Sequence, residues 1–366
     1  MGIFKHGSRY PQRKGRGREY LMTAGISIIV PCYNAAKRLP QTLAHIAAQQ
    51  VSRDLQWEVI VIDNASTDNT GDVALSCWPA TAPVPLKVIR ELRLGVRHAR
   101  MRGFAEARYD LISFVEDDNW IYPDWLAMAR EIMAQHPDVG ACGGLGEAVC
   151  EISPPAWFER YQSYYAIGEQ GPESGGDITW SRGWLFGADM TIRRSAWQSL
   201  MDRGFHFLVE DRQGTQLNSG GDVELCFALR LAGWRIWYDP RLRFRHFLQA
   251  HRLTWDYFRR LNRGNGTADV AFDPYRFVVA LDQNTLKSKL RSHWYYHVAG
   301  GIRRLLRHFR TVLSLPFDSL EGAESVLYIE RELGRFSALL CLRYRYDQNI
   351  SDIRKKFGKD FDKNKS

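Results

Sequence analysis

Short apolar runs alternate with helix-like segments over residues 26–142. The runs are rich in β-branched residues and end at proline or polar residues, which is typical of buried strands. Strands are expected at residues 26–30, 57–62, 86–90, 111–115 and 139–142. Helices are expected at residues 36–50, 69–77, 96–107 and from Pro123 to about residue 135. This alternation predicts βαβ units and a parallel sheet covered by helices on both faces.

The pattern loosens beyond about residue 145. Tryptophan, proline and glycine dominate residues 154–190, as expected of loops that shape a cleft. A helix is expected at residues 223–232 and a short strand at residues 235–238. From about residue 285 the sequence becomes helical and basic.

One apolar stripe stands out in this basic region. It consists of Val298, Ile302, Leu305, Leu306, Phe309 and Val312. Four arginines, Arg303, Arg304, Arg307 and Arg310, lie largely off the stripe. The pattern fits an ordinary helix packed on the rest of the protein, and it also fits a helix that lies on an anionic membrane surface.

Composition narrows the class of protein. The chain has 366 residues, of which 45% are hydrophobic and 25% charged, which excludes a disordered, collagen-like or disulfide-scaffold protein. No stretch approaches the roughly 18 apolar residues that span a bilayer. The six cysteines are scattered without metal-ligand spacing, which indicates reduced thiols and a cytoplasmic location. The formal net charge of +9 favours an anionic partner, such as nucleotide phosphates, nucleic acid or an acidic membrane face.

Polar residues follow three of the expected strands, at Pro31–Asn34, at Asp63 with Ser66, and at Glu116–Asn119. In an open parallel sheet, ligands bind beyond the carboxyl ends of the strands. Three consecutive acids after a buried strand repel one another and are costly without a cation. Carboxylate oxygens suit Mg²⁺ or Mn²⁺, which would clamp a diphosphate. The alternative interpretation is an acidic surface turn.

These motifs, taken in order over residues 24–270, resemble the inverting family-2 glycosyltransferases, and most closely their soluble members from bacterial polysaccharide biosynthesis. The matching segments are Ile28–Asn34, Val61–Thr70, Gly95–Gly103, Glu116–Asp118 at the DxD position, Trp184–Arg194 on the acceptor side, and Gly220–Leu225 at the "GEDxEL" element. The resemblance implies an α/β fold of the GT-A nucleotide-diphospho-sugar transferase type. Its mostly parallel central sheet would lie between helices and carry a helical C-terminal extension.

The resemblance also implies a domain organisation. The expected parts are a basic flexible arm at residues 1–24, a catalytic domain at 25–275, a helical region at 285–350 and a flexible basic tail at 351–366. The catalytic domain would divide into a nucleotide-binding half at residues 25–145 and an acceptor-binding half at residues 146–275.

Roles for single residues follow from the resemblance. Asp63 would bind the nucleotide base, and Asp222 would be the general base that activates an acceptor hydroxyl for inverting displacement. Donor-binding residues would be Pro31, Tyr33, Asn34, Asp63, Ser66, Arg100, Glu116, Asp117 and Asp118. Acceptor-binding residues would be Trp184, Gly187, Asp189 and Glu224. Metal ligands for Mn²⁺ or Mg²⁺ would be Asp118, Glu116 and His246, although a structural, hydrogen-bonded His246 is an equal alternative.

The sequence departs from the family pattern at two positions. Glu116 replaces the first aspartate of the DxD motif, and Gly221 replaces the acid that normally precedes the base. Three arginines, Arg259, Arg260 and Arg263, suggest either a basic lid over the diphosphate or a solvated helix end. The segment 249–255 shares only part of the QxxRW motif of processive synthases, so processive synthesis is not expected.

The leading hypothesis is therefore a metal-dependent enzyme that moves a sugar from a nucleotide-diphosphate donor, UDP by default, to a glycan or lipid-linked acceptor. It would be cytoplasmic, with a possible peripheral contact to the inner face of the cell membrane. A sugar-phosphate nucleotidyltransferase is the first alternative, but residues 31–36 lack the Gly-rich basic loop of that class. A basic nucleic-acid-binding protein is the second, and no nucleic-acid module supports it.

Overall fold

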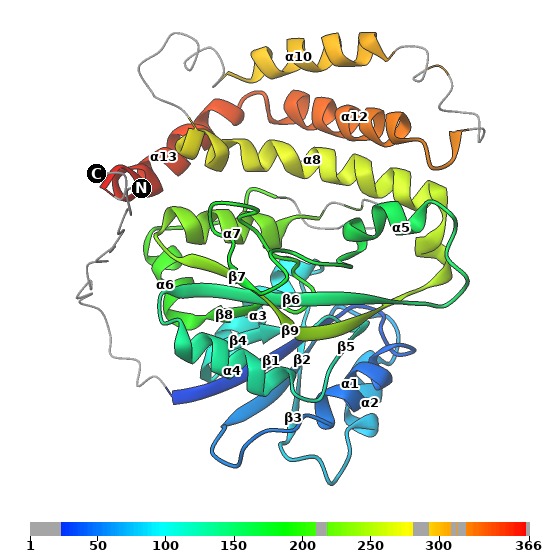
Figure 1. Ribbon diagram of the computed structural model, residues 1–366, viewed down its shortest axis with the longest axis vertical. Coiled ribbons are helices and arrows are strands. Elements are labelled where there is room, and N and C mark those ends of the chain that lie inside the picture. Colours follow the sequence, from blue (N-terminus) through cyan, green and yellow to red (C-terminus); the bar gives the residue numbers. More distant parts are fainter. Residues whose placement is uncertain are drawn as a thin grey trace, which may run out of the picture.

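The computed structural model describes residues 23–209, 217, 219–280, 293–308, 313 and 320–363 (Figure 1). The strands are β1 (Thr23–Cys32), β2 (Trp57–Asn64), β3 (Leu86–Glu91), β4 (Tyr109–Phe114), β5 (Asn119–Ile121), β6 (Val139–Cys150), β7 (Gly176–Asp177), β8 (Thr191–Arg193) and β9 (Arg235–Leu248). The helices are α1 (Leu39–Ala47), α2 (Thr70–Cys77), α3 (Val96–Glu106), α4 (Trp125–Gln135), α5 (Phe158–Tyr161), α6 (Arg194–Asp202), α7 (Gly221–Leu231), α8 (Trp255–Ala280), α10 (Trp294–Arg307), α12 (Glu324–Leu342) and α13 (Tyr346–Lys363).

The described strands form one sheet in the order β3-β2-β1-β4-β8-β6-β9-β5, and β7 pairs with β9. Strands β3, β2, β1 and β4 are parallel, as the alternating pattern predicts. The other half is mixed, because β8 runs antiparallel to both β4 and β6, and β5 and β7 run antiparallel to β9. The two long strands of this half, β6 and β9, are parallel to each other and run in the same direction as β1 to β4. Only the short strands β5, β7 and β8 of the described sheet run the other way, so the expectation of a mostly parallel sheet is confirmed. Strands of two or three residues, such as β5, β7 and β8, are too short to leave a periodic signal.

Helices cover both faces of the sheet, as expected. Successive side chains of a strand point to opposite faces. Ile29 and Ile60 accordingly belong to one apolar cluster, and Ile28 and Val59 belong to another. All four side chains are buried, so each face of the central strands packs against helices.

A helical layer covers one end of the molecule. Figure 1 shows α8, α12 and α10 stacked in that order, and α13 packs against α8. Helix α8 ends at Ala280, between the expected end of the catalytic domain at residue 275 and the expected start of the helical region at residue 285, and it packs against both α12 and α13. The two parts are joined more closely than the sequence pattern predicts.

The expected flexible tail is wrong for residues 351–363, which belong to α13. Tyr346, Ile350, Ile353 and Phe357 recur at helical spacing and are buried. The many lysines around them hide this stripe in the composition, but the stripe is what folds the segment onto the core. Residues 1–22 and 364–366 of the expected arm and tail, together with Phe309, Arg310 and Val312, lie outside the described residues.

The remaining expected helices and strands are present, but β6 continues to Cys150 and β9 to Leu248, well beyond their predicted ends at residues 142 and 238. All six cysteines are free. None of the helices in the described ranges has the length and apolarity needed to cross a membrane.

Candidate active site

Two loops meet at the carboxyl edge of the parallel half. Strands β1 and β2 are neighbours, with Cys32 opposite Asp63, so the segments that follow them lie side by side. The backbone N–H of Asn34 donates to Ser66 Oγ at 3.1 Å, and the N–H of Thr67 donates to Asn34 Oδ1 at 2.8 Å. Asn34 itself adopts a φ of 47°, a turn conformation that asparagine tolerates. The structure thus brings together the residues expected around the nucleotide base.

Asp63 is buried at this edge. Its Oδ1 accepts from the N–H of Ser66 at 3.2 Å, and Arg90 on β3 lies 3.4 Å from its Oδ2. Tyr33 is 45% exposed beside it, whereas Pro31 is buried in the end of β1. Tyr33 is therefore accessible at this edge of the sheet, while Pro31 belongs to the buried end of β1.

Asp117 is neutralised by Arg38, which the sequence does not single out. Arg38 Nε and Nη2 donate to the two carboxylate oxygens at 2.6 and 2.9 Å. The same guanidinium also donates to the carbonyl of Asn34 at 2.9 Å. A bidentate ion pair of this kind fixes both partners. Arg38 therefore joins the acidic motif to the base-side loop, and leaves Asp117 without a free oxygen.

Asp118 faces two cationic or cation-binding groups. Its Oδ2 lies 2.9 Å from Arg252 Nη1 and 3.5 Å from His246 Nε2. The other oxygen, Oδ1, is buried and has no hydrogen-bond partner.

His246 is oriented by its second ring nitrogen. Its Nδ1 lies 2.7 Å from the carbonyl of Tyr165, so this nitrogen carries the proton and Nε2 presents a lone pair toward Asp118. Arg252 Nη1 donates to that Nε2 at 3.1 Å. Two acceptors thus converge on one cationic group, the arrangement that a metal ion also requires.

A divalent cation fits this position. Within the described ranges, no group of three or more His, Cys, Asp or Glu side chains is placed to hold a metal. Asp118 and His246 nevertheless provide two ligands, and Mg²⁺ is commonly held by one or two carboxylates together with substrate phosphates. The unpartnered Oδ1 of Asp118 is the specific observation that favours a ligand here. Arg252 was not predicted as a site residue, because a partial match to the QxxRW motif was the only sequence signal for it.

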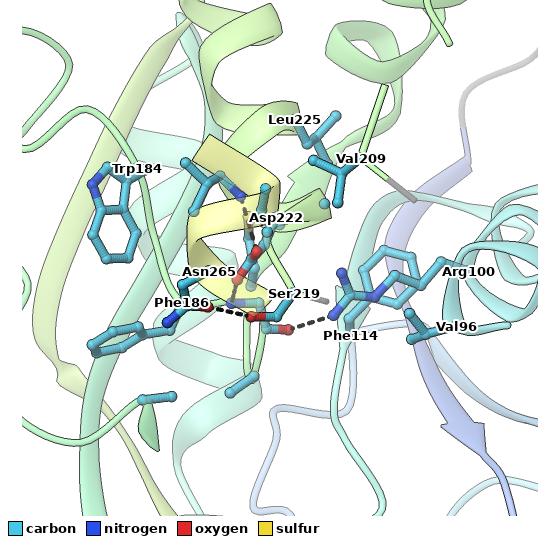
Figure 2. A pocket seen from close by; sticks show the side chains of 18 of the residues that line it. Val96, Arg100, Phe114, Trp184, Phe186, Val209, Ser219, Asp222, Leu225 and Asn265 are labelled. Carbon is cyan, nitrogen blue, oxygen red and sulfur yellow. Dashed lines mark hydrogen bonds between the residues drawn. The ribbon is translucent and has the colours of Figure 1, made fainter. Parts of the chain in front are cut away.

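A cavity of about 540 Å³ opens beside these groups (Figure 2). Glu116, Asp222, His246 and Arg252 all line it, although Glu116 lies more than a hundred residues before the other three in the sequence. Helix α8 and helix α12 supply the opposite wall. The cavity therefore lies between the sheet edge and the helical layer.

Asp222 stands in the first turn of α7 and points into this cavity (Figure 2). Its Oδ2 accepts from the N–H of Gly187 at 2.7 Å, and its Oδ1 accepts from the N–H of Val223 at 3.0 Å. A Cβ at position 187 would lie 2.8 Å from Arg100 and 2.9 Å from the Asp222 side chain. Glycine at 187 thus lets its backbone approach and orient the carboxylate.

Arg100 links Glu116 to the loop that carries Gly187. Its Nη2 donates to Glu116 Oε1 at 3.2 Å and to the carbonyl of Gly187 at 3.4 Å. Arg100 thereby supports the Gly187 loop and keeps Glu116 at the cavity wall. This position is compatible with the donor-binding role that the family resemblance implies for Arg100.

Two residues expected on the acceptor side are buried elsewhere. Asp189 has no exposed surface and lies against Trp125 Nε1 at 3.4 Å. Glu224 accepts from the N–H groups of Leu208 and Val209 and from the hydroxyl of Tyr275, at 2.7 to 2.9 Å. Neither carboxylate lines the cavity, so this placement does not support an acceptor contact for Asp189 or Glu224. Trp184 and Gly187 do line it.

The expected basic lid is also not supported. Arg259 and Arg263 both pair with the buried Glu330 of α12, at 2.8 and 2.6 Å. Arg260 pairs with Asp256 of its own helix at 3.0 Å. The charges of α8 thus hold the helical layer together.

Comparisons with known proteins were made on sequence and on structure. The family model described as "Glycosyl transferase family 2" matches residues 27–197. A chondroitin synthase of Escherichia coli is 29% identical over 128 residues, which are 34% of this chain and 18% of the relative. An N-acetylglucosaminyltransferase of Mesorhizobium japonicum is 27% identical over 226 residues, 59% of this chain and 49% of the relative. The chain thus spans less than half the length of these curated relatives.

The fold of this chain was compared with that of one solved structure. It is that of a mannosyltransferase from Pyrobaculum calidifontis in complex with GDP-Man and Mn²⁺. It superposes with a TM-score of 0.52 at 17% identity, and the alignment covers 93% of this chain and 90% of the other. At this identity the likeness concerns the fold alone.

Proposed function

Residues 27–197 belong to glycosyltransferase family 2 and the fold is of the GT-A type, and on this premise we propose that the protein transfers a sugar from a nucleotide-diphosphate donor to an acceptor hydroxyl with inversion. The observation that carries the proposal is the single cavity that Glu116, His246 and Arg252 share with Asp222. This cavity brings a cationic edge of the sheet that can bind a metal ion next to one carboxylate, that of Asp222, which is held in a fixed orientation.

The donor lies with its base at Asp63 and Tyr33. Asp63 accepts a hydrogen bond from a ring N–H, and the exposed Tyr33 covers the ring. The diphosphate then points toward Asp118 and Arg252, since Asp118 follows β4, the strand next to β1, and Arg252 lies 2.9 Å from Asp118. UDP is the default nucleotide, carried over from the family resemblance.

Asp118 and His246 would hold Mn²⁺ or Mg²⁺, with Glu116 at the cavity wall beside them. When bound, the ion neutralises negative charge on the departing diphosphate. Arg252 supplies a fixed positive charge at the same position. Its guanidinium binds a phosphate oxygen once Asp118 and His246 no longer engage it.

Asp222 removes the proton of the attacking hydroxyl. The N–H of Gly187 fixes one of its oxygens, so the carboxylate is held in one orientation. A single base suffices for direct displacement, because the nucleophile attacks opposite the leaving group and no covalent enzyme intermediate forms. The acceptor is a glycan or a lipid-linked saccharide in polysaccharide biosynthesis, in line with the printed names of the relatives.

The test measures release of nucleoside diphosphate from a panel of nucleotide sugars, with Mn²⁺, with Mg²⁺ and with a chelator. We expect one donor to be cleaved in a metal-dependent way. Asp222→Asn should lower transfer about 10²–10⁴-fold, because the amide keeps the shape but cannot accept a proton. Donor binding measured by calorimetry should be unchanged.

The matched control is Asp256→Asn, an exposed acid in the first turn of α8. It should leave turnover unchanged. Near-normal turnover of Asp222→Asn would refute the assignment of the base. Release of pyrophosphate from a nucleoside triphosphate and a sugar phosphate would instead identify a nucleotidyltransferase.

We also propose that α10 contacts an anionic membrane, which would bring the enzyme to a lipid-linked acceptor. One side of α10 packs on α12, where Gly301 is buried and Arg304 pairs with Glu332 at 2.9 Å. The other side exposes Tyr295, Ile302 and Leu306.

Arg303 and Arg307 are exposed on α10 next to this apolar side. Figure 1 places α10 at the outer edge of the helical layer. An apolar face beside exposed arginines is the chemistry that binds an anionic interface.

A further inference from the structure

The cavity beside Asp222 is lined by several arginines, and most of them are paired with acids. Arg100 pairs with Glu116, Arg252 pairs with Asp118, and both Arg276 and Arg331 pair with Asp269. These pairs leave little net charge for a ligand. Arg182 differs from them.

Arg182 forms no ion pair with any residue in the described ranges. Its Nη1 donates to the carbonyl of Glu169 at a long 3.4 Å, and its Nε is buried without a partner. The guanidinium carbon lies 3.8 Å from the centre of the Trp184 ring and 4.7 Å from that of Phe186. Two aromatic rings therefore hold this cation in place at the cavity wall.

Burial lowers the pKa of Arg182 to about 10, and the nearby charge of Asp222 acts in the opposite direction. The side chain still carries a full positive charge at neutral pH. A partly buried charge without a carboxylate partner is unfavourable, because it loses hydration and gains no counterion. A ligand that brings an anion into the cavity removes this penalty.

We propose that Arg182 binds an anionic group of the acceptor, a carboxylate or a phosphate, while the acceptor hydroxyl faces Asp222. Arg182, Trp184 and Gly187 belong to one loop, and Gly187 is the residue that orients Asp222. An anion held by Arg182 therefore fixes the acceptor relative to the base. The proposal rests on the proposed function, since only the family resemblance assigns this loop to the acceptor.

The test measures binding of three probes to the full chain saturated with UDP and Mn²⁺, by calorimetry or ligand-observed NMR. The probes are methyl glucuronide, glucose 6-phosphate and methyl glucoside, which carry a carboxylate, a phosphate and no charge. We expect at least one anionic probe to bind about tenfold or more tightly than the neutral glucoside. The preferred probe identifies the anionic group.

Arg182→Gln should remove this preference, and Arg182→Lys should keep part of it. The matched control is Arg230→Gln. Arg230 also stacks on aromatic rings, those of Trp180 and Phe227, but it does not line the cavity. The Arg230→Gln substitution should leave the preference for anionic probes unchanged.

Equal binding of charged and neutral probes, or an unchanged preference in Arg182→Gln, would overturn the proposal. If Arg182→Gln weakens binding of UDP-glucuronate but not of the free probes, the anion belongs to the donor sugar and the acceptor assignment is wrong. Donor cleavage without any acceptor is measured in parallel. If the wild type cleaves no donor, the proposed function itself is contradicted, whatever the probes do.

Discussion

Burial changes the chemistry of Asp189. The side chain has no exposed surface, and burial raises its pKa to about 8 from an ordinary value of 3.8. One of its oxygens has no hydrogen-bond partner. The carboxyl group is therefore neutral at pH 7 and belongs to the core beneath the cavity.

This protonation makes stability depend on pH. Because the folded-state pKa lies above the unfolded one, the contribution of Asp189 to stability is fully present below about pH 4 and is lost as the pH rises through about 8. Asp189→Asn mimics the protonated form, so it should flatten the pH dependence of the unfolding free energy by about 1.4 kcal/mol per pH unit over this range.

Urea unfolding of both proteins at pH 5, 6, 7 and 8 measures the difference. Other groups that titrate cancel in the comparison. Parallel curves for the wild type and Asp189→Asn would show that Asp189 is ionised in the folded protein.

At the scale of elements, α8 and α12 cross at two glycines. A Cβ on Gly334 would overlap the carbonyl of Arg263, and a Cβ on Gly266 would overlap the carbonyl of Arg331. The helices are thus in backbone contact, and ion pairs on either side of the crossing hold them there. Close contact and charge pairing together position the wall of the cavity.

Gly334→Ala should separate the two helices and lower the unfolding free energy by about 1–3 kcal/mol, because a rigid carbonyl cannot move aside. The melting temperatures of the wild type and of Gly334→Ala measure this loss of stability. Gly300→Ala on α10 is the control, since its Cβ would meet only the flexible end of Arg304, at 3.2 Å. Equal melting temperatures for the two variants would contradict a close crossing.

Most of the parallel half could be predicted from the sequence, because β1 to β4 and their helices are long enough to leave a periodic pattern. The mixed half could not. Strand β9 is 14 residues long but contains Pro240 and alternating arginines, so only its first residues were predicted as a strand. Helix α13 was missed because its lysines dominate the composition.

The candidate site was predictable where a motif marks it, as for Asp63, Asp118 and Asp222. It was not predictable for Arg38, Arg182 and Arg252. Arg38 and Arg252 reach their partners across 79 and 134 positions of sequence, and no local pattern records such a contact. Arg182 stacks on the nearby Trp184 and Phe186, but its lack of an acidic partner among the described residues is a property of the fold. Burial of Asp189 and Glu224 is likewise a property of packing.

At the scale of the whole molecule, the nucleotide edge and the outer face of α10 lie at opposite ends (Figure 1). Membrane contact through α10 would leave the donor side open to solvent. The cavity that Asp222 lines, the proposed acceptor site, lies between the two and is bordered by the helical layer. This order of parts matches an enzyme that takes a water-soluble donor and a lipid-linked acceptor.

The full chain should therefore bind vesicles that contain phosphatidylglycerol more tightly than vesicles of phosphatidylcholine. Replacing Arg303 and Arg307 by serine should weaken binding about fivefold for each arginine. Replacing Ile302 and Leu306 by serine should weaken it on both kinds of vesicle, as co-sedimentation would measure. Leu75→Ser, an exposed leucine on α2, is the control. Equal binding to both vesicles would contradict an anionic contact.

The pairing of acids on α8 with arginines on α12 also constrains how this protein can diverge. Asp269 and Asp273 lie on one helix, and their counterions Arg331 and Arg335 lie on another, encoded some sixty codons downstream. A gene fusion can join the catalytic half of one homologue to the C-terminal helices of another. Such a fusion does not necessarily keep the acids of α8 together with the arginines that pair with them. Recombinants that inherit mismatched charges would leave these two buried carboxylates to share one cation, Arg276 of their own helix, so inheriting both segments together preserves the charge balance.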